Sequence, residues 1–183
     1  MSFIHDLVKL DELSAKTEEG KRLYQTPQGQ SYPSVTTVTG ILSKDDIQAW
    51  RIRVGEEKAD QITRAATSRG NKVHKLAEVY LKNELFSQST LFNEPKTNNY
   101  KMFEALSSVL DNKVGVIRAI EAPLYSDVLR VGGRVDLVAE WENELAVIDF
   151  KTSSKPKKEH WIDNYFMQSS AYAFMFEELT KIP

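Results

Sequence analysis

Cysteine is absent from the chain of 183 residues. Its absence excludes disulfide bonds, zinc sites built on cysteine and iron–sulfur clusters held by four cysteines. Apolar runs are short, and none approaches the roughly 20 residues that a membrane-spanning helix needs. Basic residues are not in excess, because 24 lysines and arginines stand against 26 aspartates and glutamates. The resulting net charge of −2 argues mildly against a nucleic-acid partner, since phosphate contacts need basic side chains.

The placement of the basic residues is more informative than their number. The stretch Lys151–Lys158 holds four lysines and no acid. Three further lysines share one expected helix: Lys72, Lys75 and Lys82. An enzyme that must release its DNA also has no need of a strongly basic surface, so the net charge does not exclude a DNA substrate.

The N-terminal region lacks an apolar stretch behind a basic start, which a secretory or transit signal requires. Acidic residues come early instead: Asp6, Asp11 and Glu12. We therefore expect a cytoplasmic protein of a phage or its bacterial host, without membrane association. Residues 1–20 are polar and irregular, and we expect them to form a loose arm.

Apolar periodicity divides the rest of the chain into helices followed by strands. After a small hairpin around Pro27-Gln28-Gly29, helices are expected over residues 34–41, 43–54, 56–67, 69–82 and 97–112. Strands are expected over residues 116–125, 129–141 and 144–152, and a last helix over residues 159–179. N-caps are expected at three serines: Ser34, Ser43 and Ser68. This order predicts an α/β or α+β fold with a small mixed central sheet flanked by helices. We expect one domain over residues 1–183, mainly helical over residues 34–112, with its sheet and last helix over residues 116–179.

One hairpin carries the chemistry of the sequence. If Glu142-Asn143 is a two-residue loop, paired residues sum to 285, and Asp136 faces Asp149. Lys151 then lies one step along the same face. Directly opposed Cβ atoms are about 4.5–5.5 Å apart, and carboxylates that close repel each other unless a cation lies between them. The register therefore predicts a divalent-metal site with a lysine beside it.

The same register separates an apolar core face from the face of the acids. The core face holds six apolar residues: Val135, Leu137, Ala139, Ala146, Ile148 and Phe150. Val138 and Val147 share the face of the acids. Oxygen ligands without thiols favour Mg²⁺ or Mn²⁺, and Lys151 would orient the attacking water or stabilise an oxyanion. A half-buried hairpin with exposed charges is the alternative, but it does not explain two acids at facing positions.

Gly-Gly-Arg-Val-Asp, followed after a hairpin by Ile-Asp-Phe-Lys-Thr-Ser, resembles the core signature of RecB-type nucleases in the PD-(D/E)XK superfamily. The resemblance implies a restriction-endonuclease-like core. It also implies that Asp136 and Asp149 bind metal and that Lys151 is catalytic. The backbone carbonyl of Phe150 would be a further metal ligand.

Two helical motifs extend the resemblance. Gly70-x-x-x-His74-x-x-x-Glu78 puts its last two residues on one helix face, although a lone histidine beside an apolar stripe is more often packed than a ligand. In the family this motif implies His74 as a metal ligand and Glu78 as an assisting catalytic residue. Gln168-x-x-x-Tyr172 resembles the motif after the lysine, whose side chains brace the site or touch DNA. Tyr172 fits a core-facing stripe equally well.

Three residues are candidates for contacts with the DNA backbone: Arg69, Ser34 and Lys155. Ser34 belongs to Pro-Ser-Val-Thr, a segment similar to one in phage and mitochondrial members, and a helix N-terminus there would suit a phosphate. Lys155 lies in the lysine-rich loop, which is equally compatible with plain solvation. Taken in their order along the chain, these five motifs resemble those of the branch of mitochondrial and phage exonucleases. Members of that branch usually add another strand and helix, so we expect a shortened C-terminus here.

The resemblance implies a metal-dependent exonuclease that degrades single-stranded DNA from a free end. Helices before the sheet would form an arch through which the strand is threaded, and delivery by a helicase or recombinase stays open. One alternative is an endonuclease on the same fold, against which the missing helix-turn-helix signature argues. The other is a nucleic-acid-binding module with a dead site, against which the intact Asp136, Asp149 and Lys151 argue.

Overall fold

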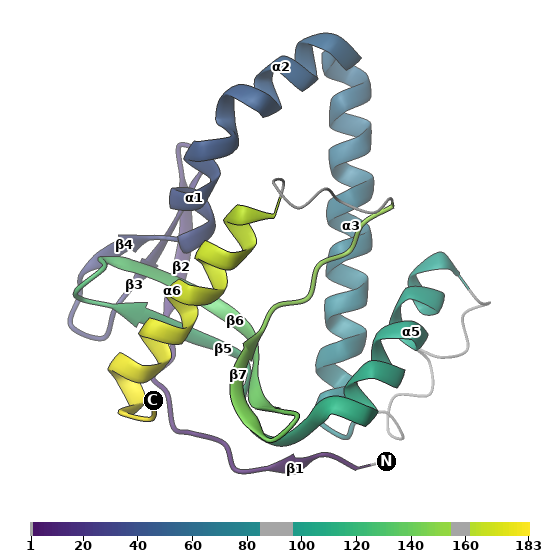
Figure 1. Cartoon of the computed structure of the whole chain (residues 1–183). Coiled ribbons are helices and arrows are strands. Elements are labelled where there is room, and N and C mark those ends of the chain that lie inside the picture. Colours follow the sequence, from purple (N-terminus) through teal and green to yellow (C-terminus); the bar gives the residue numbers. More distant parts are fainter. Residues whose placement is uncertain (1, 85–96, 155–161) are drawn as a thin grey trace.

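The computed structural model describes residues 2–84, 97–154 and 162–183, and these form a mixed α/β fold (Figure 1). The central sheet has the strand order β1-β5-β6-β7, with β1 parallel to β5 and the other pairs antiparallel. Its strands are β1 (Ile4–His5), β5 (Val114–Ser126), β6 (Val131–Trp141) and β7 (Glu144–Ile148). A smaller antiparallel sheet contains β2 (Ser14–Glu18), β3 (Lys21–Gln25) and β4 (Ser31–Pro33).

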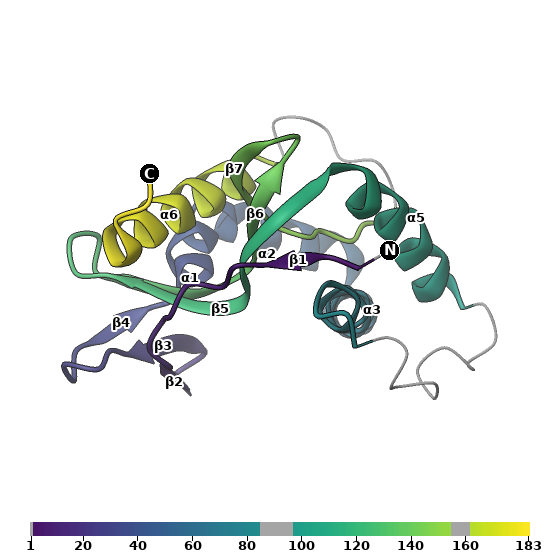
Figure 2. The same ribbon diagram turned by 90° about the horizontal axis from the view of Figure 1, so that it is seen from below.

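Helices flank both faces of the central sheet, as the views from two directions show (Figures 1 and 2). On one face lies α6 (Asp163–Thr180), and on the other lie α3 (Glu56–Leu81) and α5 (Asn98–Lys113). The chain leads from the small sheet to the far end of α3 through α1 (Val35–Thr39), η1 (Gly40–Ser43) and α2 (Lys44–Val54). The expected mixed sheet flanked by helices is thereby confirmed.

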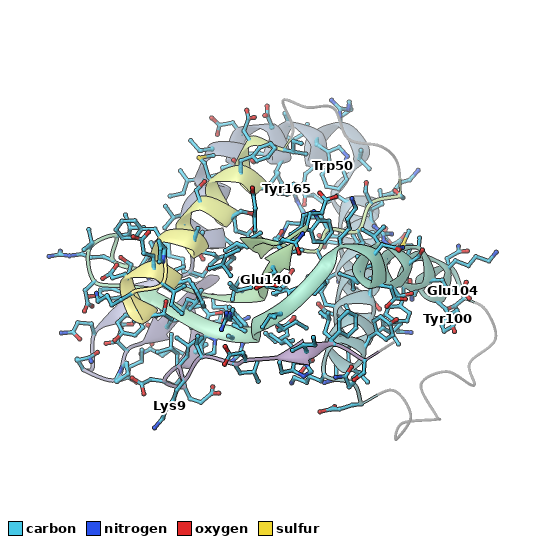
Figure 3. The ribbon with its side chains drawn as sticks, turned by 60° about the horizontal axis from the view of Figure 1, so that its bottom comes forward. Lys9, Trp50, Tyr100, Glu104, Glu140 and Tyr165 are labelled. Atoms are coloured by element: carbon cyan, nitrogen blue, oxygen red, sulfur yellow. The ribbon has the colours of Figure 1, made fainter. Side chains whose placement is uncertain are left out.

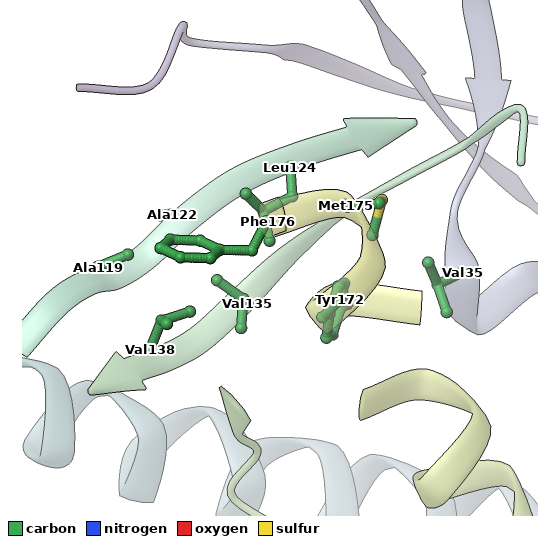
Figure 4. Close-up of a cluster of buried hydrophobic side chains, with 9 residues drawn as sticks. All are labelled: Val35, Ala119, Ala122, Leu124, Val135, Val138, Tyr172, Met175 and Phe176. Carbon is green, nitrogen blue, oxygen red and sulfur yellow. The ribbon is translucent and has the colours of Figure 1, made fainter. Parts of the chain in front are cut away.

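Two apolar clusters attach these helices to the sheet. The first fixes α6 and is drawn in Figure 4; its buried members are Val35, Ala119, Ala122, Leu124, Val135, Val138, Tyr172, Met175 and Phe176. The second fixes α3 and α5 on the opposite side; its buried members are Phe3, Ala77, Leu81, Leu110, Ile117, Leu137, Ala139 and Phe150. Helices therefore cover both faces of the central sheet. This packing fixes the positions of side chains at the edge of the sheet.

The hairpin between β6 and β7 has the expected register. Glu142 and Asn143 have φ values of 54° and 74°, as a two-residue turn of this kind requires. Trp141 pairs with Glu144, and Leu137 pairs with Ile148. The ladder ends there, however, because β7 stops at Ile148. The expected pairing of Asp136 with Asp149 across the strands is therefore wrong.

The expected core face of β6 is also wrong at one residue. Leu137 and Ala139 belong to the second cluster, whereas Val135 packs with α6 in the first. Side chains two residues apart share a face in a regular strand, so the strand rotates between residues 135 and 137. The irregularity continues across the ladder, where Glu121 of β5 has a φ of 47°.

The long helix α3 replaces two expected helices. It continues through Ser68 and Gly70, so Ser68 caps nothing. A glycine inside a helix costs only about 1 kcal/mol relative to alanine, so Gly70 alone does not end α3. At its start, Arg51 of α2 forms ion pairs with Glu56 and Asp60 across the junction at Gly55.

The expected loose arm is tied to the core instead. Ile4 and His5 form β1 beside β5, where a two-residue strand is too short to give a periodic signal. The backbone N–H of Phe3 donates to Asn83 Oδ1 at 2.9 Å, and Asn83 Nδ2 donates back to Phe3 O at 3.0 Å. Within the part of the chain that the structure describes, no helix is long and apolar enough to cross a membrane.

Candidate metal centre

Three elements bring titratable side chains together at the rim of the sheet. His74 comes from α3, Glu121 from β5 and Asp136 from β6. One ligand atom of each residue lies within 4.8 Å of the other two. Asp136 is buried and only 8% exposed, while the other two are half-buried. We call these three residues the ligand cluster.

The backbone N–H and carbonyl of Phe150 link the ligand cluster to the chain after β7. Its N–H donates to Asp136 Oδ2 at 2.6 Å, and its carbonyl oxygen lies 2.8 Å from His74 Nε2. Since a carbonyl only accepts, Nε2 donates in this arrangement. His74 Nδ1 then faces Asp136 Oδ1 at 3.3 Å. The carbonyl of Phe150, expected as a ligand, is thus brought beside the cluster.

The electrostatics of the ligand cluster fit a cation. Burial, reinforced by the negative charge of Asp136, raises the pKa of Glu121 to about 7. The hydrogen bond to Asp136 raises the pKa of His74 above its ordinary value, although burial opposes the shift. Carboxylates crowded in this way repel each other, and a cation between them removes that repulsion.

The available donors fit a divalent metal ion. Glu121 and Asp136 supply carboxylate oxygens, Phe150 supplies a carbonyl oxygen, and His74 supplies a ring nitrogen once it is neutral. Oxygen-rich sets of this kind suit hard divalent cations, and no thiolate is present in the sequence to favour a softer one. These four groups are the ones that would hold the ion.

Asp149 lies outside the ligand cluster and is held by other partners. Its Oδ2 forms an ion pair with Lys151, and its Oδ1 accepts a hydrogen bond from Gln168 Nε2 at 3.2 Å. Lys151 Nζ in turn donates to Gln168 Oε1 at 3.2 Å. Burial raises the pKa of Asp149, and the nearby ammonium of Lys151 opposes that shift. Asp149, expected as a metal ligand, and Lys151, expected as a catalytic residue, therefore lie next to the ligand cluster and pair with each other.

Gln168 is positioned from α6 by its neighbours. It is 7% exposed, and its Nε2 also lies 3.3 Å from the hydroxyl of Tyr172. Tyr172 is 3% exposed and packs in the first apolar cluster, in agreement with the core-facing stripe that its spacing allowed. The ring of Tyr165, labelled in Figure 3, has its centroid 5.1 Å from Lys151 Nζ and adds a cation–π contact.

The close packing of Tyr172 explains one glycine of the Gly-Gly-Arg-Val-Asp motif. A Cβ atom added at Gly133 would lie 2.5 Å from Tyr172 Cε1, a distance at which the ring must move. The neighbouring Gly132 lies against Tyr24 in the same way, with 2.8 Å between the added Cβ and Tyr24 Cβ. The motif therefore allows α6 and the small sheet to approach β6 closely.

Glu78 lies near the ligand cluster but its carboxylate is engaged elsewhere. It forms ion pairs with Lys75 at 2.9 Å and Lys82 at 2.7 Å. Burial acts to raise the pKa of Glu78, but the two lysines outweigh it and the net shift is downward. Glu78 lines a hollow of about 370 Å³ together with His74 and Glu121. The structure thus places it beside the site and outside the ligand cluster.

The three expected DNA contacts have different surroundings. Ser34 is 3% exposed, and its hydroxyl accepts from Thr37 N at 3.0 Å, so it caps α1 and is not brought to the surface of the site. Arg69 is half-buried on α3, and its Nε is buried without a hydrogen-bond partner among the described residues. Lys155 lies outside the described residues.

Comparison of the sequence with protein-family models identifies the family of this chain. A family model described as the PD-(D/E)XK nuclease superfamily matches residues 48–182, which include every residue of the ligand cluster. The chain belongs to the PD-(D/E)XK nuclease superfamily. The match leaves out the small sheet and α1, which precede residue 48.

Curated relatives of this superfamily member share the name mitochondrial genome maintenance exonuclease 1. The Homo sapiens protein is 33% identical over 135 residues, which cover 68% of this chain and 38% of that protein. The Mus musculus protein is 29% identical over 138 residues, covering 71% of this chain and 39% of that protein. The chain therefore spans about two fifths of the length of these relatives.

Glu121 is the member of the ligand cluster that the sequence motifs did not reveal. One signal in the sequence and one in the structure point to it. It is the one acid in the strand Val114–Ser126. The β5–β6 register also pairs Ile120 with Leu137 and Ala122 with Val135, which leaves Glu121 opposite Asp136.

Proposed function

We propose that the chain is a Mg²⁺- or Mn²⁺-dependent deoxyribonuclease that hydrolyses single-stranded DNA from a free end. The observation that carries this proposal is the ion pair of Asp149 and Lys151 directly beside the ligand cluster. Membership of a nuclease superfamily supports phosphodiester hydrolysis, and the printed name of the curated relatives supports an exonuclease.

The residues of this chain divide the work in the proposed reaction. A divalent ion held by the ligand cluster would activate a water molecule and neutralise charge on the phosphate. Lys151 would hold that water or donate to the phosphate oxygen that gains charge in the transition state. Asp149 would hold the Lys151 side chain in place through their ion pair, and Gln168 would fix the positions of both side chains through its hydrogen bonds to them.

The surroundings of the site offer a path for a single strand. Figure 1 shows α1 and α2 on one side and α3 on the other, joined above the first turns of α6. A groove of about 920 Å³ lies between α2 and α6 and is lined in part by Trp50, Arg53 and Asn164. Trp50, labelled in Figure 3, would stack on a base, and Arg53 would meet the backbone phosphates. A strand threaded under these helices needs a free end, which would make the enzyme an exonuclease.

The test uses end-labelled linear single-stranded DNA and an internally labelled circle, each with Mn²⁺ and with EDTA. We expect cleavage of the linear strand alone, and only with Mn²⁺. Cleavage of both substrates would replace the exonuclease with an endonuclease on the same fold. Failure to cut either, together with no binding of Mn²⁺ in a calorimetric titration, would favour a nucleic-acid-binding module with a dead site.

A pair of lysine variants distinguishes cleavage at the proposed site from cleavage by a contaminating nuclease. Lys151→Ala should remove cleavage of the linear strand. Lys113→Ala is the matched control, because Lys113 pairs with Glu142 beside the turn between β6 and β7. Equal activity of the two variants would contradict the proposed role of Lys151.

A further inference from the structure

The backbone of β5 is unusual at the residue that enters the ligand cluster. Glu121 has a φ of 47°, in the left-handed region that a glutamate seldom adopts. Ile120 packs with the second apolar cluster and Ala122 with the first. Residues 120 and 122 would share one face of a regular strand, so the strand rotates at Glu121.

The rotation turns the carboxylate of Glu121 towards α3. Its Oε1 lies 3.9 Å from His74 Nδ1, and it forms the ligand cluster with Asp136. The side chain of Glu121 is 24% exposed, and the residue lines the hollow of about 370 Å³ beside α3. Its place in the cluster therefore depends on an unfavourable backbone conformation, which other contacts must stabilise.

Arg134 is the side chain that contacts this backbone. Its Nη1 donates to the carbonyl oxygen of Glu121 across the β5–β6 ladder. Its other terminal nitrogen lies 3.8 Å from Glu12, an exposed residue near the N-terminus. Arg134 itself pairs with Pro123, two residues beyond Glu121 on β5. The guanidinium thus spans the irregular part of the strand.

We propose that Glu121 is a metal ligand and that Arg134 is its positioning residue, acting through the Glu121 carbonyl. Rotated backbone at a strand irregularity commonly re-aims a side chain next to a functional site. Groups that orient a metal ligand typically contribute 10–100-fold to metal affinity. The inference deepens the proposed function, on which it rests only for the presence of a metal, because it requires metal binding and not DNA cleavage.

The test is calorimetric titration of Mn²⁺, without DNA, into protein stripped with EDTA. Four proteins are compared: the wild type, Glu121→Gln, Arg134→Met and the double variant. We expect Glu121→Gln to raise the Kd for Mn²⁺ by about 10–100-fold and Arg134→Met to raise it by about tenfold. In the double variant, the loss of Arg134 should add less than a twofold change, because the ligand that it positions is already lost.

Two controls separate positioning from charge and from folding. Arg118→Met removes the same charge from β5, where Arg118 pairs with Asp6, and should leave the Kd for Mn²⁺ unchanged. Thermal unfolding in EDTA shows whether each variant folds. If Arg134→Met does not fold, Arg134→Lys takes its place in the same comparison, since one ammonium keeps the charge but not the shape of the guanidinium.

Each outcome decides the proposal. An unchanged Kd in Glu121→Gln would overturn the assignment of Glu121 as a ligand. Equal losses from changing Arg134 in the presence and absence of the Glu121 carboxylate would show that Arg134 acts by another route. Binding that follows the expected pattern in a protein that cuts no DNA would leave this inference standing and remove the nuclease.

Discussion

The backbone N–H of Phe150, two residues after the end of β7 at Ile148, donates to the carboxylate of Asp136 at 2.6 Å. A side-chain oxygen thus takes the place of a backbone acceptor. The exchange releases Asp149 from the strand and lets it turn towards Lys151 and Gln168.

Asp149→Asn should lower the rate of cleavage while preserving the fold. Asparagine matches the size of aspartate and still accepts from Gln168, but it removes the charge that holds Lys151. We expect the single-turnover rate to fall by about 10²-fold, which is typical for the loss of a group that stabilises transition-state charge. Thermal unfolding in EDTA should move by only a few degrees. Loss of the folded state would mean that Asp149 serves the core.

Gln168→Met should lower the rate without changing metal affinity. Methionine fills a similar volume but makes neither the bond to Asp149 nor the bond from Lys151. We expect about a tenfold slower single turnover, at the low end of effects for positioning groups. Tyr172→Phe is the control, since it removes only the hydroxyl that contacts Gln168 and should change the rate by less than threefold. A slower Tyr172→Phe than Gln168→Met would reverse these roles.

Gly133→Ala should destabilise the protein by about 1–3 kcal/mol, the usual cost of overpacking a buried contact. The added methyl group would lie 2.5 Å from Tyr172 Cε1. Gly40→Ala is the control, because nothing lies within 4 Å of a Cβ there and its φ is −64°. Urea unfolding measures both free energies. Equal stabilities would show that α6 moves away at no cost.

Binding of Mn²⁺ should stabilise the folded protein, because the ligand cluster exists only in the folded state. Free ion at 100 times its Kd adds about 2.7 kcal/mol to the free energy of unfolding. Differential scanning calorimetry in EDTA and then in excess Mn²⁺ measures the change. The increase should shrink in Glu121→Gln and stay the same in Lys113→Ala. A melting temperature insensitive to Mn²⁺ in the wild type would contradict a metal site.

The local pattern of the sequence was enough to place the hairpin and the side chains around it. The two-residue turn at Glu142-Asn143 sets the β6–β7 register. The spacing of four residues places Gln168 and Tyr172 on the same face of a helix. Glu121 required more than local pattern, because its position depends on the β5–β6 register, which shifts twice between Val114 and Ala119. The continuity of α3 through Gly70 likewise depends on tertiary contacts that outweigh local propensity.

The arm over residues 1–20 shows a different limit. A two-residue strand such as β1 has no periodicity to detect, and its position is set by partners far along the chain, including Asn83. The end of β7 at Ile148 depends in the same way on one side chain, Asp136, which competes with the ladder for a backbone N–H. Both features belong to the assembled fold.

The ion pairs of Arg51 with Glu56 and Asp60 stabilise the angle between α2 and α3 at their junction. Glu56 is exposed and Asp60 is half-buried, so dissolved salt weakens these ion pairs, that of Glu56 most. Salt also weakens the attraction between basic side chains and phosphates. In the proposed enzyme, ionic strength therefore affects the angle between α2 and α3. It also affects how tightly the DNA strand binds in the groove beside α2.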